Sequence, residues 1–350
     1  MTTEKKETKK STKIILAVAI ILFIVGCVVG FKFYSIYFAP NVTSNEKYLY
    51  IKTGDQLDDL YAEIKQKRIL NDVGSFSQAA AKMELAPKVK PGRYKLTKGM
   101  NNRNLVNMLK SGNQEPVKLK FQNIRMKEDF AAYLAKSLEA DSNAFIGLLD
   151  SAALVEKYGF TTDNIYTMFI PNTYELYWTT TPIEFFDKMH TEYEKFWNAD
   201  RKKKAEALNL TPMQVTVLAS IVDGEAIFDK EMPIIAGLYL NRLSKGIFLQ
   251  ADPTVIFANG DFTVKRVTGP LLRVDSKYNT YKYAGLPPGP IMMPSIKAVD
   301  AVLNKDTNSY IYMCAKEDFS GYHNFAVTKA AHEVNARKYR DALNKRNIFR

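Results

Sequence analysis

The apolar run from Ile14 to Phe31 constrains the fold of this chain more than any other feature. Its 18 residues carry no charge, which is about the length that a helix needs to cross the core of a bilayer. Five lysines and two glutamates precede the run, and an excess of lysine marks the cytoplasmic side of such a helix. We therefore predict a cytoplasmic tail over residues 1–13, a transmembrane anchor over residues 14–34 and an extracytoplasmic remainder.

A signal peptide and a lipoprotein N-terminus are the alternatives to a membrane anchor. A cleaved signal peptide is disfavoured because no A-x-A-like site ends the run. The residues Ile24 to Cys27 resemble a lipobox, which would make Cys27 a lipidated N-terminus. The apolar sequence continues past Cys27 to Phe31 and so suits a membrane helix better, but the lipoprotein alternative stays open.

Composition narrows the function classes. With 350 residues, 46% of them hydrophobic, the chain has room for an anchor and two modest folded domains. Cys27 and Cys314 offer no plausible intramolecular disulfide, and no Cys/His cluster has metal-ligand spacing, so neither a metal nor a cofactor is predicted. The formal net charge is +12, of which +3 belongs to residues 1–13, so an anionic partner is expected. On the outer side of the membrane, the anionic polymer that the chain can meet is the cell wall, not nucleic acid.

The region after the anchor predicts a small mixed module. A strand over Tyr48–Ile51 and an amphipathic helix over Asp55–Arg68 are followed by a similar strand and helix, the latter over Asn102–Lys110. Residues 82–120 hold ten Lys or Arg and two acids. This charge favours contact with an anionic glycan or peptide; a merely solvated face is the alternative.

Alternating residues predict a half-buried strand over Val117–Phe121, and helices are expected over Lys127–Leu138, Asn143–Tyr158 and Pro182–Lys204. Between them, Phe169 to Leu176 contains a Pro-Asn turn followed by aromatic residues. Aromatic rings stack on the apolar faces of sugars, and amides bind hydroxyl groups. Asn172 and Tyr174 are therefore candidate sugar contacts, although a core strand with a turn explains the pattern equally well.

The stretch from Thr211 to Pro253 contains the residues on which the predicted function mainly depends. Thr211 is a suitable N-cap, Pro212 suits the first helical position, and Gln214 completes a capping box. Glu225 continues the apolar stripe of this helix, and burial raises the pKa of a carboxyl group until it can donate a proton at neutral pH. Asp223 lies about 200° round the helix and cannot share that pocket.

Glu225 is therefore the candidate catalytic residue. The competing reading is a solvated glutamate near a helix end, and Gly224 just before it is expected to end or kink the helix. A second helix is predicted from Pro233 to Leu243. Gln250 and Asp252 lie in the loop that follows, where they either contact a ligand or cap the next element.

Downstream polar and aromatic residues are further candidates. They are Tyr278, Asn279 and Tyr281, followed by a rigid loop over residues 285–291 with three prolines that suits one side of a glycan groove. His323 is a candidate for the cleft, with a packed or surface histidine as the alternative. A buried strand is predicted over Tyr310–Ala315, and a final helix is predicted over Thr328–Asn344.

Several of these segments together resemble the YceG-like family, whose members are endolytic murein transglycosylases. The resemblance rests on LASIVDGE at 218–225, LNRL at 240–243, LQADPTV at 249–255, YNTY at 278–281 and GLPPGPI at 285–291. The chain departs from the family pattern in carrying Asn172 where Asp is common and Ala251 where a hydroxyl residue is frequent. It also has Met292 to Ser295 where the family continues N-P-G.

The resemblance implies an α+β fold. After the anchor it implies a LysM-like module over residues 45–118, a helical connector over 119–160 and a catalytic domain over 161–350. The implied reaction is cleavage of the β-1,4 bond between MurNAc and GlcNAc within nascent glycan strands, giving 1,6-anhydroMurNAc ends, with Glu225 acting as acid and then as base. The implied partners are peptidoglycan strands, the inner membrane and peptidoglycan synthases.

The resemblance also favours substrate contact by the remaining candidates, which are Gln250, Asp252, Asn241, Tyr174, Asn172, Tyr278, Asn279, Tyr281 and His323. Two alternative functions stay open. One is a muramidase-type hydrolase that uses Glu225 and Asp252 as a carboxyl pair. The other is a non-enzymatic wall-binding anchor whose basic module makes the contact.

Overall fold

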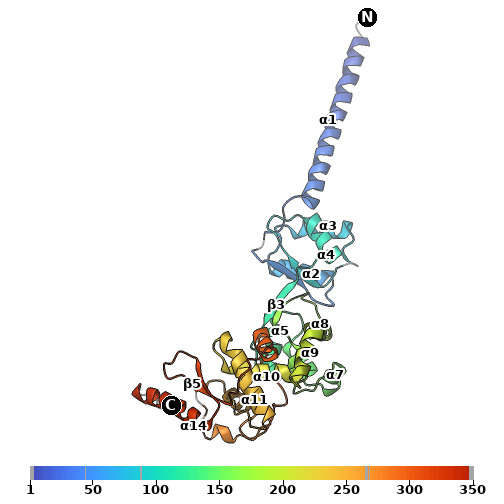
Figure 1. Cartoon of the computed structure of the whole chain (residues 1–350). Coiled ribbons are helices and arrows are strands. Elements are labelled where there is room, and N and C mark those ends of the chain that lie inside the picture. The colour runs from blue at the N-terminus through green and yellow to red at the C-terminus, as the bar shows by residue number, and fades with distance from the viewer. Residues whose placement is uncertain (1–3, 44, 87–88, 265–266, 268, 347–350) are drawn as a thin grey trace. The chain divides into compact units, whose positions relative to one another are not determined.

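The structure, a computed structural model, describes residues 4–43, 45–86, 89–264, 267 and 269–346 (Figure 1). The chain divides into two compact units, one made of residues 1–117 and 176–179, the other of 118–175 and 180–350. The outermost parts of the predicted tail and catalytic domain, residues 1–3 and 347–350, lie outside the described residues, as does Lys88 of the basic window.

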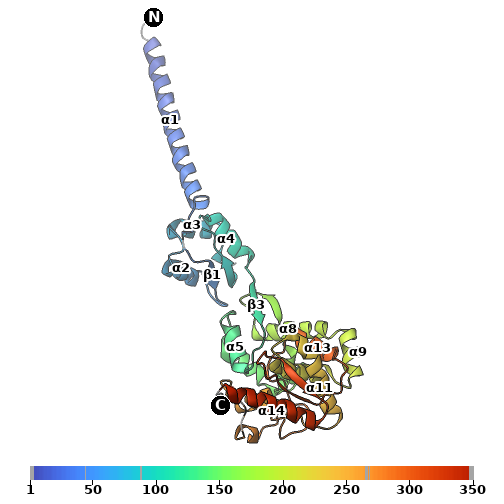
Figure 2. The ribbon, with the colours of Figure 1, turned by 60° about the vertical axis from the view of Figure 1, so that its left-hand side comes forward.

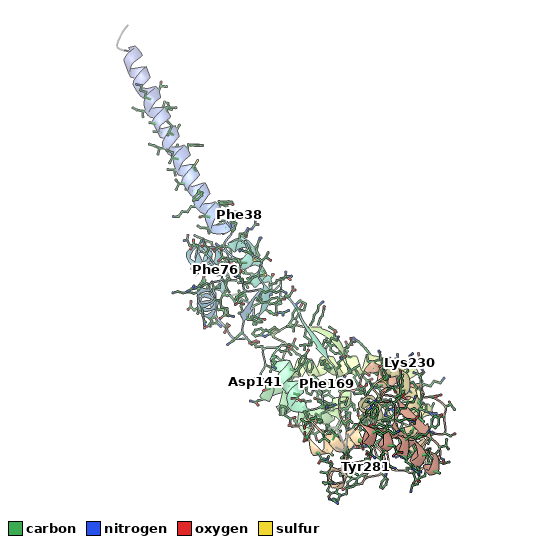
Figure 3. All side chains as sticks on the ribbon, turned by 90° about the vertical axis from the view of Figure 1, so that its left-hand side faces the viewer. Phe38, Phe76, Asp141, Phe169, Lys230 and Tyr281 are labelled. Atoms are coloured by element: carbon green, nitrogen blue, oxygen red, sulfur yellow. The ribbon has the colours of Figure 1, made fainter. Side chains whose placement is uncertain are left out.

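The first unit begins with one long helix, α1 (Glu4–Tyr37). From Ile14 to Tyr34 the side chains of α1 are exposed, and sticks stand out along the helix in Figure 3. The segment Thr12–Tyr37 has a mean hydropathy of 3.2. The length and composition of α1 therefore suit a membrane span.

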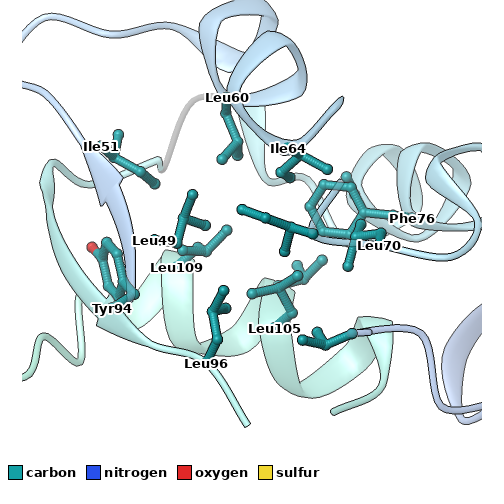
Figure 4. Packing of buried hydrophobic residues seen from close by; sticks show 14 of the residues in the cluster. Leu49, Ile51, Leu60, Ile64, Leu70, Phe76, Tyr94, Leu96, Leu105 and Leu109 are labelled. Carbon is teal, nitrogen blue, oxygen red and sulfur yellow. The ribbon is translucent and has the colours of Figure 1, made fainter. Parts of the chain in front are cut away.

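A small module, residues 39–117, follows α1. Strands β1 and β2 pair antiparallel from Tyr48 opposite Lys95 to Ile51 opposite Gly92. Leucine, isoleucine and aromatic side chains from both strands and three helices form its core (Figure 4). The structure confirms both predicted strand-and-helix pairs and adds α3, which Asp72 caps. The elements are β1 (Tyr48–Ile51), α2 (Leu57–Gln66), α3 (Val73–Lys82), β2 (Gly92–Lys95) and α4 (Asn102–Ser111).

Buried amides join the end of α1 to the small module. The Asn102 Nδ2 donates to the Ile36 carbonyl oxygen at 2.8 Å, and the Asn41 Nδ2 donates to Asn102 Oδ1 at 2.7 Å. Because an unsatisfied buried amide is costly, this network fixes α1 against the module.

The second unit is a helical domain with two small sheets, so the fold is mixed α+β. Helix α10 (Pro212–Glu225) lies at its centre, with every residue from Val215 to Val222 buried, and packs against four other helices. Those helices are α9 (Ala199–Ala207), α11 (Met232–Ser244), α12 (Asp252–Asn259) and α13 (Ile296–Leu303).

The remaining elements of the second unit enclose that centre. Strands β3 and β4 pair with each other, and β5 pairs antiparallel with β6 from Tyr312 opposite Ala326 to Ala315 opposite His323. Helix α14 lies along this second hairpin (Figures 1 and 2). The elements are β3 (Val117–Phe121), α5 (Lys127–Ala135), α6 (Ser142–Leu149), α7 (Ala152–Lys157), β4 (Asn172–Leu176), α8 (Pro182–Phe196), β5 (Tyr312–Ala315), β6 (His323–Ala326), α14 (Lys329–Lys345) and the 3-10 turns Ile165–Met168, Asp229–Glu231 and Leu271–Arg273.

Three predicted elements differ from the structure. The helix expected over 143–158 is two helices, because Ser151 caps a new start at α7. The helix expected over 182–204 is also two, because the Asn198 side chain accepts a hydrogen bond from the Arg201 amide and begins α9. The strand expected to be buried over 310–315 begins at Tyr312 and is half-buried.

Candidate active site

Helix α10 delivers Glu225 to the site as its last residue. Thr211 caps the helix and Gln214 completes the capping box, as predicted. Gly224 does not interrupt the helix, which ends one residue later. Instead, Gly224 allows a close approach, since a Cβ at this position would lie 3.0 Å from the Pro253 Cβ. The start of α12, which carries Asp252 and Pro253, can therefore pack directly against the end of α10.

A cavity of about 610 Å³ opens in front of Glu225. Helices α10 and α11, the 249–252 loop, the β5–β6 hairpin and α14 each contribute to its wall. The lining residues are Glu225, Leu238, Tyr239, Arg242, Leu249, Gln250, Asp252, Val267, Tyr281, Met313, Cys314, Ala315, His323, Tyr339, Arg340 and Leu343. The cavity is large enough for a sugar unit and carries several polar groups around one carboxyl group.

The carboxyl group of Glu225 is set up as a proton donor. The residue keeps some surface exposed, while protein atoms enclose the carboxyl group itself. This burial raises the pKa of Glu225 to about 7, and the nearby Asp252 charge adds to the rise. The Tyr239 hydroxyl donates to Glu225 Oε1 at 2.7 Å, and this bond and the Arg242 charge lower the pKa of Glu225 and limit the shift. Glu225 is therefore substantially protonated near neutral pH.

Asp252 provides a second carboxyl group in the same cavity. It begins α12, and its Oδ1 accepts a hydrogen bond from the Tyr281 hydroxyl at 2.6 Å. Burial raises the pKa of Asp252, and the bond from Tyr281 opposes that rise. Gln250, two residues earlier, has a left-handed backbone with φ of 50°, which is strained for a residue other than glycine.

The turn at residues 279–281 holds that loop in place. The Gln250 amide donates to the Thr280 carbonyl oxygen, and the Ala251 amide donates to Thr280 Oγ1 at 3.0 Å. Asn279 is fully buried, and its Nδ2 donates hydrogen bonds to the backbone carbonyl oxygens of Leu272 and Val274. The YNTY segment thus fixes the loop and places the Tyr281 hydroxyl on Asp252.

Arg242 ties the cavity walls together. Its Nη1 donates to the carbonyl oxygens of Phe248 and Leu249 and to Gln250 Oε1, at 2.8, 2.9 and 3.2 Å. Its Nε donates to the Ile311 carbonyl oxygen just before β5. Only 7% of Arg242 is exposed, so its charge acts inside the site rather than in solvent.

His323 faces the cavity from β6 with a fixed ring. Its Nδ1 donates to Glu231 Oε2 at 3.0 Å, and its backbone amide donates to Glu231 Oε1 at 2.9 Å. The Glu231 side chain is 6% exposed, so this contact is shielded from water. A ring held through Nδ1 leaves Nε2 for a ligand.

The structure brings half of the predicted site residues together. Glu225, Gln250, Asp252, Tyr281 and His323 line the cavity, whereas Asn172, Tyr174, Asn241, Tyr278 and Asn279 do not.

The five outlying residues lie elsewhere in the second unit. Tyr174 is buried, stacks on Phe121 and donates to the Ile170 carbonyl oxygen, while the exposed Asn172 accepts from the next backbone amide. Asn241 donates to the carbonyl oxygens of Asn308 and Tyr310. These bonds, like those of Asn279, favour structural roles, and substrate contact by the five stays a prediction.

The first half of the proline-rich loop lies away from Glu225, whereas its last residue, Ile291, reaches the end of α10, where a Cβ on Gly224 would lie 3.6 Å from Ile291 Cδ1. Residues 285–288 line a different cavity of about 510 Å³ with Thr211, Gln214 and Val217, near the start of α10. The loop then follows α10, because the Ile291 amide donates to the buried Ser220 Oγ at 3.1 Å.

Tyr239, Arg242 and Glu231 are site residues that the sequence did not single out for the site. Tyr239 and Arg242 are three apart on α11, so they share one face, and this spacing is the signal that could have found them. Glu231 meets His323 across 92 positions, which no local pattern reveals. Among the described residues, no group of three His, Cys, Asp or Glu side chains could hold a metal ion.

Comparisons with known proteins agree with this architecture. Residues 49–338 match the model of the YceG-like family. An endolytic murein transglycosylase of Bacillus subtilis (strain 168) is 25% identical over 315 residues, which cover 85% of each chain. One of Streptococcus pneumoniae serotype 2 is 24% identical over 261 residues, 65% of this chain and 46% of the relative, so the match spans about half of that protein.

A crystal structure shows a related fold. A YceG-like protein from Listeria monocytogenes superposes with a TM-score of 0.54 and 24% identity, covering 82% of this chain and 97% of that one.

Proposed function

The chain belongs to the YceG-like family, and on that basis we propose that it is a membrane-anchored lytic transglycosylase that cuts peptidoglycan glycan strands internally. The names of its Bacillus and Streptococcus relatives support the activity. Helix α1 crosses the membrane once with its N-terminus in the cytoplasm, and both folded parts lie outside. The small module is LysM-like and contacts the wall through its basic surface.

One observation carries the mechanism, namely the enclosed Glu225 carboxyl group with a pKa raised to about 7. In its protonated form Glu225 donates to the glycosidic oxygen, and the bond from MurNAc C1 to that oxygen breaks. The MurNAc 6-hydroxyl oxygen then bonds to C1 while its proton passes to the Glu225 carboxylate. The product is a 1,6-anhydroMurNAc end, no water is consumed, and Glu225 returns to its starting state.

The surrounding groups prepare Glu225 for both steps. Tyr239 holds one carboxyl oxygen, which leaves Oε2 for the glycosidic oxygen and then for the hydroxyl proton. Asp252, fixed by Tyr281, places negative charge near the sugar carbon that becomes positive in the transition state. Gln250 and His323 are suited to bind sugar hydroxyl or acetamide groups.

The test is Glu225→Gln in the full-length protein, assayed on peptidoglycan strands with anhydro ends counted by mass spectrometry. The amide keeps the shape but cannot transfer the proton, so we expect a loss of at least a hundredfold. Asp223→Asn is the matched control. Asp223 is also on α10, but it accepts hydrogen bonds from Ser295 and does not line the cavity. Normal turnover by Glu225→Gln would contradict the proposal.

A hydrolase is the second candidate, because Asp252 lines the same cavity as Glu225. A hydrolysed end is heavier than an anhydro end by one water molecule, so the same spectra separate the two reactions. The hydrolase predicts that Asp252→Asn abolishes cleavage, whereas the lyase predicts slower cleavage with anhydro ends retained. Binding without cleavage by the wild-type protein would instead favour a wall anchor.

A further inference from the structure

A groove lies where α1 meets the small module. On one side are Lys32, Phe33 and Ile36 of α1, and on the other are Gln78, Ala81 and Lys82 of α3. Its volume is about 410 Å³. That is room for roughly 14 water molecules at about 30 Å³ each, and hence for a lipid headgroup with the start of an acyl chain.

The position of the groove along α1 indicates what lies beside it. The uncharged run ends at Phe31, and Lys32 is the first charged residue after it. Phe33 and Tyr34 are 56% and 53% exposed. The Arg103 guanidinium lies over the Phe38 ring. Exposed aromatic residues that directly follow an apolar span mark the boundary between hydrocarbon and headgroups. The groove therefore lies at headgroup depth in the leaflet that faces the module.

The groove has the chemistry of a lipid with a negative headgroup. Its floor is apolar along Val29, Phe33 and Ile36, while Lys32 and Lys82 supply two ammonium groups from opposite sides. Both lysines are exposed, and no ion pair within the described residues uses either of them. Asn102 of α4 donates to the Ile36 carbonyl oxygen of α1 and to Ser75 Oγ of α3, and these bonds hold the two sides of the groove together.

We propose that this juxtamembrane groove binds one anionic phospholipid, with its phosphate between Lys32 and Lys82 and the start of an acyl chain along Phe33 and Ile36. The inference rests on the proposed membrane anchoring and is independent of the catalytic mechanism. The bound lipid fills the gap between α1 and the small module and stabilises the module on the membrane surface.

The test uses the full-length protein in detergent, titrated with dioleoylphosphatidylglycerol or dioleoylphosphatidylcholine and read by native mass spectrometry. We expect the anionic lipid to bind more tightly, and Lys32→Gln with Lys82→Gln to weaken it on the order of tenfold. Lys65→Gln with Lys98→Gln is the matched control, because both lysines are exposed on the same module and do not line the groove. Ala81→Trp, which fills the groove without removing charge, should also displace the lipid.

Equal binding of both phospholipids, or equal losses in the groove and control variants, would overturn the proposal. Preference for a polyprenyl phosphate over phosphatidylglycerol would overturn the assignment to a phospholipid. Alkaline carbonate extraction of cell membranes provides a separate readout. Release of the wild-type protein would refute the anchoring, whereas a retained protein without lipid preference would refute only the groove.

Discussion

Asp223 and Glu225 lie two positions apart on α10, and their carboxyl groups have different surroundings. Asp223 accepts hydrogen bonds from the Ser295 amide and hydroxyl at the start of α13, so its charge is committed to the fold. Within the described part of the chain Glu225 accepts one hydrogen bond, from Tyr239, and its carboxyl group faces the cavity. Because residues two apart on a helix project from different faces, Asp223 bonds within the fold while Glu225 faces the cavity.

Replacing Glu225 should stabilise the protein at high pH. The folded-state pKa of Glu225 is raised from 4.5 to about 7, so the wild-type protein loses stability as pH rises between these two values. Glu225→Gln carries no charge and avoids that loss. We expect it to be more stable by up to about 3 kcal/mol at pH 8 and nearly equal to wild type at pH 4.5. Urea unfolding at both pH values measures this, and a constant difference would contradict it.

Removing the Tyr239 hydroxyl should shift the pH dependence of cleavage. Cleavage by the wild-type protein should fall as pH rises through about 7, because Glu225 loses its proton there. In Tyr239→Phe the carboxylate loses its hydrogen-bond donor, so the pKa of Glu225 rises further and the fall should move up by about one pH unit. The readout is kcat/KM against pH. A lower rate with an unmoved inflection would indicate a structural role only.

At the scale of elements, close backbone contacts hold the proline-rich loop in the second unit. A Cβ on Gly289 would lie 1.9 Å from the Asp163 carbonyl oxygen. Gly289→Ala should therefore destabilise the protein by about 3 kcal/mol or more. Gly147→Ala in α6 is the control, because nothing lies within 4 Å of its Cβ, and it should be neutral or stabilising. Thermal unfolding of both variants measures the effect, and equal melting temperatures would contradict it.

The sequence predicted the main elements, but it did not predict the hydrogen-bond partners of the polar residues. Caps and apolar spacing are local, so α10 with its capping box and the β1–α2 and β2–α4 pairs were predictable. Sugar contact by the YNTY segment stays a prediction: Tyr281 lines the cavity, while Asn279 and Thr280 bind backbone groups that the sequence pattern did not identify. The proline-rich loop was expected to form one side of a glycan groove, and this stays a prediction; residues 285–288 line a cavity near the start of α10, and Ile291 reaches Gly224 at its end.

Glu225 itself was predictable because its spacing on α10 continues a buried stripe. Its partner Tyr239 comes from the next helix and depends on how α10 and α11 pack. The Glu231–His323 contact depends on the return of the chain through β6. Non-local packing therefore decides which residues surround the carboxyl group.

At the scale of the whole molecule, the proposed contact with the wall should depend on charge. Residues 14–350 carry a formal charge of +9, and residues 82–120 supply +8 of it. Retention on purified peptidoglycan should therefore weaken steeply between about 0.01 M and 1 M salt, as the screening length falls from about 30 Å to about 3 Å. A pull-down at a series of salt concentrations measures this, with Glu225→Gln used so that the wall stays intact. Salt-independent retention would argue against the basic surface as the contact.

The far wall of the catalytic cavity comes late in the chain, from Tyr339, Arg340 and Leu343 of α14. During synthesis the chain carries Glu225 long before it carries these three residues. The cavity is therefore complete only once residue 343 has been made. On the proposed function, the protein should not cut glycan strands before that point. A chain ending at Val327 should accordingly yield few anhydro ends while the small module still folds, and full activity from it would show that the acid works without that enclosure.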